Sequence, residues 1–304
     1  MPTIHKWKPS ASGFIYDPTL YVDGTAFAAG DTLVFNDGKA NAVSAVPGLG
    51  NLTTGTYQFS ISGASAGLQL TNLQLDGASA INVTGPGALT WSNTDQFSNN
   101  GLIQVGSASA SGTLNYNLYG GIATGAAFVN NGSVAVQNNS FMLIYPGAVG
   151  SNGGTILNAA GGLLSVNSGS GLRISTASGY ADGSTIDGTV RNDGLINVGG
   201  GGPTGSTATL YMGTTYNGTG LVSVRGAPGS TRPPDTRAIV GGPASGTFAI
   251  ASGKVEFDGK VNTAAVNFLD NAGELEIAPT YALSKGATCS PAPSAGSRPA
   301  TPSG

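Results

Sequence analysis

The segment Phe97-Ser-Asn-Asn-Gly101-Leu-Ile-Gln-Val105 contains the sequence pattern on which the predicted fold depends. It begins with an apolar residue, passes through asparagine and glycine, and ends in an alternation of branched apolar and polar residues. Related stretches are Phe128-Val-Asn-Asn-Gly132-Ser-Val-Ala-Val136, Ile156-Leu-Asn-Ala-Ala-Gly-Gly162-Leu-Leu-Ser-Val166, Val190-Arg-Asn-Asp-Gly194-Leu-Ile-Asn-Val198 and Tyr216-Asn-Gly-Thr-Gly220-Leu-Val-Ser-Val224, with degenerate copies from Phe248 to Phe257 and from Phe268 to Ile277.

The copies recur with a period typical of a solenoid. Their closing apolar residues lie at positions 105, 136, 166, 198, 224, 257 and 277, and the steps between them are 31, 30, 32, 26, 33 and 20. A repeat of this size cannot bury its apolar face alone and stacks on its neighbours. The alternation predicts strands with one inward face, such as Val134 and Val136 inward with Ala135 outward. We therefore expect an all-β, parallel β-solenoid.

The asparagine of each copy predicts a corner between strands. Asn and Asp tolerate left-handed backbone and bond to their own main chain, and stacked amides can pair along a column. The glycine that follows is expected to supply a positive φ angle. A glycosylation or ligand site is the competing interpretation, and the corner is favoured because the position repeats with the fold. The corner residues are Asn99, Asn130, Asn158, Asn192 and Asp270, and the glycines are Gly101, Gly132, Gly194 and Gly220.

Composition divides the chain into three regions. Only 9% of the 304 residues are charged, so a nearly neutral chain with regular Val, Ile and Leu is interpreted as folded. Residues 1–47 are rich in aromatic side chains and predict an N-terminal cap, because a solenoid exposes an apolar cross-section at each end. Residues 48–280 hold the repeats. Residues 281–304, rich in Pro, Ser, Gly and Ala, predict a disordered tail.

Charge and hydropathy exclude several classes of function. A net charge of −3 gives no electrostatic case for nucleic acid or an anionic membrane. No segment reaches the ~18 apolar residues of a membrane span, and the N-terminal residues lack the apolar region of a secretory signal. The sole cysteine, Cys289, excludes a disulfide framework. A cytosolic chain, export by another route and a fragment without its start are all compatible with this pattern.

Few residues suggest catalysis. The only histidine, His5, lies in the predicted cap, which removes most triad chemistry. Glu256 and Glu276 occupy equivalent places in successive copies and could approach the ~5–5.5 Å carboxyl separation of retaining glycosidases. Lys254 and Glu274 share their register, however, and indicate a surface charge column. We expect no catalytic centre and no cofactor.

Two groups of charged residues remain as candidate sites. Carboxylates beside turns could ligate calcium, but Asp-Gly is also common turn chemistry, and the turn is favoured. This first group comprises Asp182, Asp187 and Asp193, with Arg173 and Arg191. The second surrounds a Pro-Pro pair where the repeat pattern is interrupted, and long insertions of a solenoid often bind partners. It is the candidate recognition loop, with Arg225, Arg232, Asp235 and Arg237.

The repeats resemble the passenger regions of bacterial autotransporters and hemolysin-like adhesins. The resemblance rests on the Asn-Gly-rich copies at 97–105, 190–198 and 268–277, and on Gly30-Asp-Thr-Leu-Val-Phe35, which looks like the N-terminal entry of such proteins. It implies a right-handed parallel β-helix displayed outside a Gram-negative cell. The family's signal sequence, its C-terminal β-barrel and the acidic Gly-Asp repeats of its type I-secreted relatives are not found in this sequence.

The leading hypothesis is a secreted or surface-displayed, non-catalytic, adhesin-like β-solenoid that binds polysaccharide or protein surfaces. The alternative is a β-helical polysaccharide lyase or phage tailspike depolymerase, which needs an acidic groove with Arg or Lys along one face. An ice-binding solenoid is disfavoured, because the Thr-x-Thr motif that it would need in an array stands alone at 207–209. The oligomeric state is left open.

Overall fold

The protein is described here by a computed structural model. It describes residues 3–8, 12–13, 17–28, 31–35, 41–44, 52–55, 58–62, 66–70, 73–75, 77–84, 88–93, 97–118, 126–145, 155–167, 169–174, 189–199, 208–213, 215–226, 236–241, 244–257, 265–269, 273–277 and 288–289. Within these residues the structure is built from strands and contains no α-helix, and a single 3₁₀ turn, η1 (Pro18–Leu20), lies near the N-terminus. None of the described segments forms a helix that could cross a membrane.

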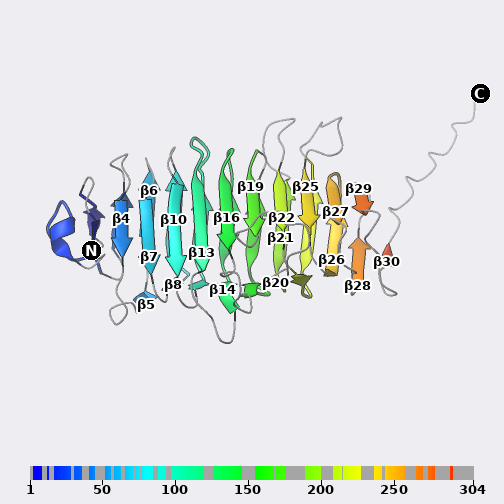
Figure 1. Ribbon diagram of the computed structural model, residues 1–304, viewed down its shortest axis with the longest axis horizontal. Helices are drawn as coiled ribbons and strands as arrows, with labels where there is room; N and C mark the ends of the chain where they lie inside the picture. Colours follow the sequence, from blue (N-terminus) through cyan, green and yellow to red (C-terminus); the bar gives the residue numbers. More distant parts are fainter. Residues whose placement is uncertain are drawn as a thin grey trace, which may run out of the picture.

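The strands form three parallel sheets along an elongated rod (Figure 1). Sheet 1 contains β1 (Ile4–Lys6), β3 (Thr32–Phe35), β6 (Gln58–Ser62), β9 (Ala80–Thr84), β12 (Leu102–Val105), β15 (Ser133–Val136), β18 (Leu163–Val166), β21 (Leu195–Gly199), β24 (Leu221–Arg225), β26 (Ser245–Ile250), β28 (Ala265–Leu269) and β30 (Thr288–Cys289). Sheet 2 contains β2 (Ser12–Gly13), β4 (Asn41–Ser44), β7 (Ala66–Leu70), β10 (Ala88–Asn93), β13 (Thr113–Leu118), β16 (Phe141–Tyr145), β19 (Gly171–Ile174), β22 (Thr209–Met212), β25 (Arg237–Val240), β27 (Lys254–Phe257) and β29 (Glu274–Ile277). Sheet 3 contains β5 (Leu52–Gly55), β8 (Leu73–Leu75), β11 (Phe97–Asn99), β14 (Ala126–Asn130), β17 (Thr155–Asn158), β20 (Thr189–Asn192) and β23 (Thr215–Asn217).

Between β5 and β24 the chain visits the three sheets in a fixed order and then advances by one rung. From β12 in sheet 1 it passes to β13 in sheet 2 and β14 in sheet 3, and returns to sheet 1 as β15, which pairs in parallel with β12. This winding confirms the predicted all-β parallel β-helix. Pairing begins inside the predicted cap, since β1 already pairs with β3. Of the predicted tail, Thr288 and Cys289 form β30 beside β28, and its other residues lie outside the described part.

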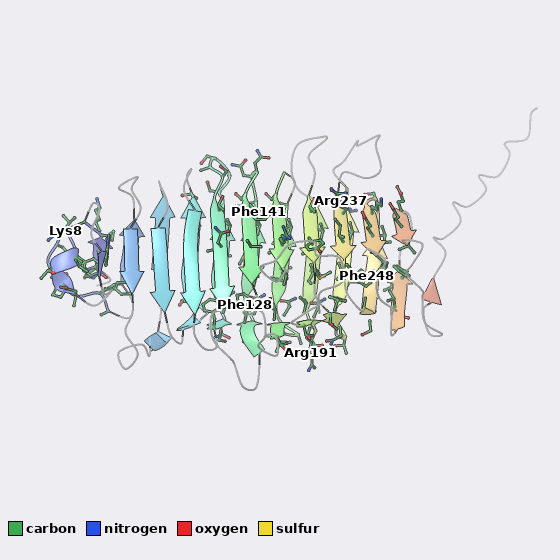
Figure 2. The ribbon with its side chains drawn as sticks, in the orientation of Figure 1. Lys8, Phe128, Phe141, Arg191, Arg237 and Phe248 are labelled. Atoms are coloured by element: carbon green, nitrogen blue, oxygen red, sulfur yellow. The ribbon has the colours of Figure 1, made fainter. Side chains whose placement is uncertain are left out.

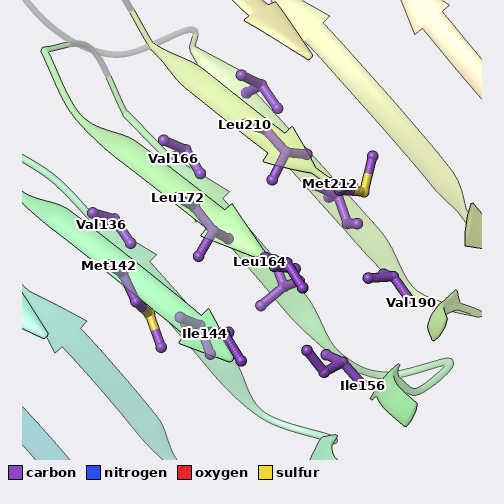
Figure 3. Packing of buried hydrophobic residues seen from close by; sticks show 14 of the residues in the cluster. Val136, Met142, Ile144, Ile156, Leu164, Val166, Leu172, Val190, Leu210 and Met212 are labelled. Atoms are coloured by element: carbon purple, nitrogen blue, oxygen red, sulfur yellow. The ribbon is translucent and has the colours of Figure 1, made fainter. Parts of the chain in front are cut away.

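Strand alternation places apolar side chains inward in continuous columns. Val105, Val136 and Val166 lie in register on successive rungs of sheet 1 and are buried, while Ala135, which precedes Val136 on β15, is partly exposed. Inward residues of sheet 2 face these columns across the rod, as Figure 3 shows for Leu172 and its neighbours. Each fully buried aliphatic side chain contributes about 1.5–3 kcal/mol, so the stacked columns hold the coils together.

The two last copies of the repeat are out of phase with the others, which corrects the sequence interpretation. In the regular copies the apolar-x-Asn part lies in sheet 3 and the closing valine in sheet 1. Phe248 and Phe268 instead lie in sheet 1, and Phe257 and Ile277 in sheet 2. The register partner of Val224 is Ile250, not Phe257. The step from Val224 to Phe257 in the sequence pattern therefore joins positions on different sheets and is not the length of one coil.

The corner glycines do not have the positive φ angles that the sequence predicted. Positive φ occurs at other described positions, including Gly106, Asn138 and Asn139, which lie between sheets 1 and 2. Gly132 has a different role, because a Cβ atom there would lie 2.2 Å from the carbonyl oxygen of Gly101 on the previous rung. Gly220 has the same relation to the Gly194 carbonyl, also at 2.2 Å. Glycine is required at this corner because successive coils approach too closely for a side chain.

Candidate functional site

The predicted corner asparagines form a buried, hydrogen-bonded column between sheets 3 and 1. The side-chain amide of Asn99 donates to the Asn130 side-chain oxygen, Asn130 donates to Asn158, and Asn158 donates to Asn192, each at 2.8 Å. Each amide also donates to a backbone carbonyl at the start of a sheet 1 strand, for example Asn130 to Leu163 at 3.2 Å. The column therefore binds each coil to the next.

The asparagine column ends where the fifth copy replaces asparagine with glycine. The next position of the column after Asn192 is residue 218, but this residue is glycine and has no side chain. The Tyr216 hydroxyl instead lies 3.2 Å from the Asn192 amide nitrogen. Burial raises the pKa of Tyr216 to about 12, so its hydroxyl stays protonated near neutral pH. The four asparagines are fully buried and cannot meet an external ligand or a glycan. Asp270 lies outside the described residues.

His5 is a buried part of the N-terminal segment. Its Nδ1 atom lies 3.1 Å from an Asp23 carboxylate oxygen, and its Nε2 atom lies 2.9 Å from Asp31. The rings of Tyr21 and Phe27 pack edge-to-face with the imidazole ring, with centroids 5.3 and 5.9 Å away. Because each ring nitrogen already contacts a carboxylate and the ring is 1% exposed, His5 is not presented to a substrate as a base.

The two candidate glycosidase carboxylates lie in register, as predicted, with a lysine between them. Glu256 of β27 pairs with Glu276 of β29. The Lys254 ammonium group binds the Glu276 carboxylate and lies 3.8 Å from Glu256 and 3.9 Å from Glu274. The hydrogen bond to Glu276 is the main cause that raises the pKa of Lys254. The group is a network of ion pairs on the outer face of sheet 2.

The structure separates the residues of the candidate calcium site. Asp182 and Asp187 lie outside the described residues. Asp193 accepts hydrogen bonds from Arg191 Nε at 2.7 Å and from the backbone and hydroxyl of Thr219, which lower its pKa. Arg173 belongs to sheet 2, on another side of the rod from Arg191 in sheet 3. In the part of the chain that is described, no three His, Cys, Asp or Glu residues are grouped as a metal site would need.

The described members of the candidate recognition loop lie on two different sheets. Arg232 and Asp235 are outside the described residues. Arg225 ends β24 in sheet 1, and Arg237 begins β25 in sheet 2, so the two arginines flank one corner of the rod. Each lines a separate depression on its own sheet.

The depression on sheet 1 has polar walls. Its volume is about 300 Å³, and its outward polar side chains come from consecutive rungs: Ser165 on β18, Asn197 on β21, and Ser223 with Arg225 on β24. Ser165, Asn197 and Ser223 are register partners, so their hydroxyl and amide groups form a row along the rod. Asn167 also lines the depression, two residues after Ser165. This row presents donors and acceptors to solvent at intervals of one rung, about 4.8 Å.

The depression on sheet 2 has aromatic and guanidinium walls. Its volume is about 210 Å³, and it is lined by Phe141, Gly171, Leu172, Arg173, Thr209, Tyr211, Arg237 and Ile239. Sequence reasoning considered Arg173 and Arg237 in other groups and missed Phe141 and Tyr211. An outward aromatic residue in an alternating strand was the available signal, but only the register shows which of them share a face.

Comparison with known proteins identifies no relative. No family model, no curated protein and no solved structure matches this chain. The two depressions are therefore the features of this protein from which a function can be inferred.

Proposed function

We propose that this protein is a non-catalytic β-solenoid, secreted or displayed on a bacterial surface, that adheres to polysaccharide through the outer faces of its sheets. The observation that carries the proposal is the row of Ser165, Asn197 and Ser223 beside Arg225 in the polar depression of sheet 1. Hydroxyl, amide and guanidinium groups are the hydrogen-bonding partners that a polyhydroxylated chain requires.

The shape of the depression supports an extended ligand. The row follows the rod axis across rungs that repeat every 4.8 Å or so, and a linear polymer could contact several rungs at once. Weak contacts that are repeated along one polymer sum to a useful avidity. Such a face suits a surface adhesin better than a small-molecule receptor, because small-molecule pockets are mostly enclosed and apolar.

The experiment is a binding measurement on immobilised polysaccharides. The purified protein is applied to a panel of neutral and acidic glycans, together with a variant that carries Ser165→Val, Asn197→Leu and Arg225→Gln. We expect the unchanged protein to bind at least one glycan and the triple variant to bind it about tenfold more weakly, as the loss of a few polar contacts would cause.

The control variant is Arg191→Gln, which removes one positive charge from β20 of sheet 3 (Figure 2), at a residue that does not line the depression. It should bind as the unchanged protein does. Binding to no glycan by a folded protein would refute the proposal, and so would equal binding by the triple variant. Attachment to matrix proteins but not to glycans would favour the protein-binding form of the adhesin hypothesis.

The enzymatic alternative is tested on the same panel. A lyase or depolymerase would release unsaturated or reducing ends, and we expect no release. The ion pairs of Lys254 with Glu256 and Glu276 support this expectation, because one ammonium group already contacts both carboxylates. Measured release that is lost in Glu256→Gln would overturn it.

A further inference from the structure

An exposed phenyl ring on sheet 2 lies over a glycine of the next rung. Phe141 of β16 is 40% exposed and is the register partner of Gly171 of β19. A Cβ atom at Gly171 would lie 3.1 and 3.3 Å from two carbons of the ring. A Cβ atom at position 171 would require the ring to shift by a few tenths of an ångström, so glycine allows the ring to lie against the sheet in its present position.

A second aromatic ring lies one rung further along the same face. Tyr211 of β22 is the register partner of Arg173, whose guanidinium carbon lies 5.3 Å from the ring centroid, in the geometry of a cation–π contact. Phe141 and Tyr211 thus belong to strands separated by one intervening rung, about 9.6 Å apart along the rod. Between them lies the depression of about 210 Å³.

Arginine side chains give this aromatic face a positive charge. Arg237 of β25 is 45% exposed, and its guanidinium lies 4.0 Å from Glu256, at the limit of an ion pair. Glu256 is itself 3.8 Å from Lys254, which also contacts Glu274 and Glu276. The three carboxylates therefore gather around the lysine on β27 and β29. The two guanidinium groups, on β19 and β25, lie on the aromatic side of this network.

We propose that Phe141, Gly171, Arg173, Tyr211 and Arg237 form a second glycan-binding site, specific for sugars that carry a carboxylate. This inference rests on the proposed polysaccharide-binding function and adds the substrate class and a separate face. The rings stack on the C–H faces of sugar rings, and the guanidinium groups bind the carboxylate, for which their planar fork is suited. The rung spacing is comparable to the length of one sugar unit in a linear chain.

The same observations disfavour a peptide ligand. The site lies on the face of sheet 2, where β19 and β22 already pair with strands on both sides, so no edge is available for strand addition. Strong protein interfaces need deep pockets for aromatic or aliphatic anchors. Here the rings are on the protein and the depression between them is open, as expected for stacking against a flat, hydrophilic ring.

The test compares carboxylated polysaccharides with their carboxyl-reduced forms, which keep the sugar backbone and lose the charge. The probes are polygalacturonate, alginate and hyaluronan, and binding of the full chain is measured at low and high salt. We expect the acidic form of at least one probe to bind about tenfold or more tightly than its reduced form, with the difference falling as salt is raised.

Matched variants assign that preference to the site. Arg237→Gln should remove most of the difference between acidic and reduced forms, whereas Tyr211→Ala should weaken both forms. Arg191→Gln, which removes the same charge from sheet 3, should change neither. Circular dichroism shows whether each variant keeps its strand content. If one of these changes unfolds the protein, the conservative variants Arg237→Lys and Tyr211→Phe are used in its place. Arg237→Lys should keep part of the preference for acidic forms, and Tyr211→Phe should bind both forms almost as tightly as the unchanged protein.

Three outcomes would overturn the inference. They are equal binding of acidic and reduced polymers, an equal loss of preference in Arg191→Gln, and equally tight binding of polyglutamate, which would indicate a general polyanion surface. Failure of this inference can be distinguished from failure of the proposed function. Binding to neutral glycans that depends on Asn197 and Arg225 would leave the adhesive role intact, while binding to no glycan would remove both.

Discussion

The middle and the C-terminal coils of the rod are held together by different interactions. From β11 to β23 each coil has a strand in sheet 3, and the amide column from Asn99 to Asn192 joins the rungs. From β26 onward no strand of sheet 3 is found in the described residues, and phenyl rings fill the interior. Phe248, Phe257 and Phe268 have centroids 5.7–6.1 Å apart.

Tyr216 joins the two regions. Its hydroxyl meets the last asparagine, and its ring centroid lies 5.4 Å from that of Phe248, the first phenylalanine of the cluster. The change follows coil length. In sheet 1 the register partner of Val136 is Val166, whereas that of Phe248 is Phe268, so the chain completes the coil from β26 to β28 with distinctly fewer residues. A long coil is thus held by hydrogen bonds at a third corner, whereas a short coil is held by large apolar side chains.

Phe248→Ala is the substitution with the largest expected effect on this contrast. Removing a fully buried ring that contacts three other aromatic rings should lower the free energy of unfolding by about 3–5 kcal/mol. Urea unfolding gives the magnitude, and amide hydrogen exchange gives the location. We expect β26–β29 to lose protection before the coils that contain the asparagine column.

Phe141→Ala is the matched control, since Phe141 is an exposed ring on the same rod (Figure 2). Its truncation should cost less than about 1 kcal/mol, as is usual for surface positions. If the two variants lost equal stability, or if exchange increased uniformly along the rod, the idea of two separately stabilised regions would be wrong.

Asn130→Ala tests the other region. The substitution removes the acceptor of Asn99 and the donor to Asn158 and to the Leu163 carbonyl. Each buried polar group left without a partner costs about 1–3 kcal/mol, so we expect a loss of about 3 kcal/mol in chemical unfolding. The loss of protection should centre on β11–β18.

The exposed pair Asn100 and Asn131 is the control for the buried pair Asn99 and Asn130. Asn131 donates to Asn100 at 2.9 Å in an exposed position one residue further along each copy. Water can replace this bond, so Asn131→Ala should cost about 0.5 kcal/mol. Equal costs for Asn130→Ala and Asn131→Ala would show that the buried column adds nothing beyond an ordinary hydrogen bond.

Tyr216→Phe separates the two functions of the joining residue. It removes the hydroxyl and leaves the ring beside Phe248. Asn192 still donates to the Leu221 carbonyl at 3.2 Å, so no buried donor loses all its partners, and we expect a loss of about 1 kcal/mol. Thermal unfolding measures it. A loss as large as that of Asn130→Ala would mean that the hydroxyl terminates the column more strongly than its geometry indicates.

The sequence predicted the fold well because a solenoid repeats its own packing. Alternation in the copies ending at Val136 and Val198 requires an inward face, and recurrence requires stacking. The sequence could not fix the phase of the last two copies. Their apolar and glycine pattern fits a corner between sheets 1 and 2 as well as one between sheets 3 and 1, and only strand register distinguishes them. The glycine at position 132 was identified, but for the wrong reason, since its constraint comes from the neighbouring coil.

The candidate sites were less predictable for the same reason. Arg225 and Arg237 are close in sequence and suggested one loop, but a corner places them on different sheets. Phe141 and Tyr211 are far apart in the sequence, and they line one depression because their strands are separated by a single rung. A binding face of a β-helix is assembled across coils, so its residues have no fixed spacing that a motif could capture.

The smallest expected effect is an opposite pH response of the two regions. Asp193, in the middle region, has a pKa below its usual 3.8, first because of the Thr219 backbone N–H, so the stability it contributes is present above that value and is lost as the pH falls through the folded pKa. Lys254, in the C-terminal region, has a pKa above 10.5, so its contribution is present below that value and is lost as the pH rises through the folded pKa. Both groups are partly exposed, so each effect should stay below about 1 kcal/mol.

Asp193→Asn should reduce the acid-induced loss of stability, measured by unfolding between neutral pH and pH ~3. Part of that loss should remain in the variant, because the pKa values of Asp23 and Asp31 are also lowered. Lys254→Gln should reduce only the alkaline loss, and an unchanged alkaline limb in that variant would exclude Lys254 as its source.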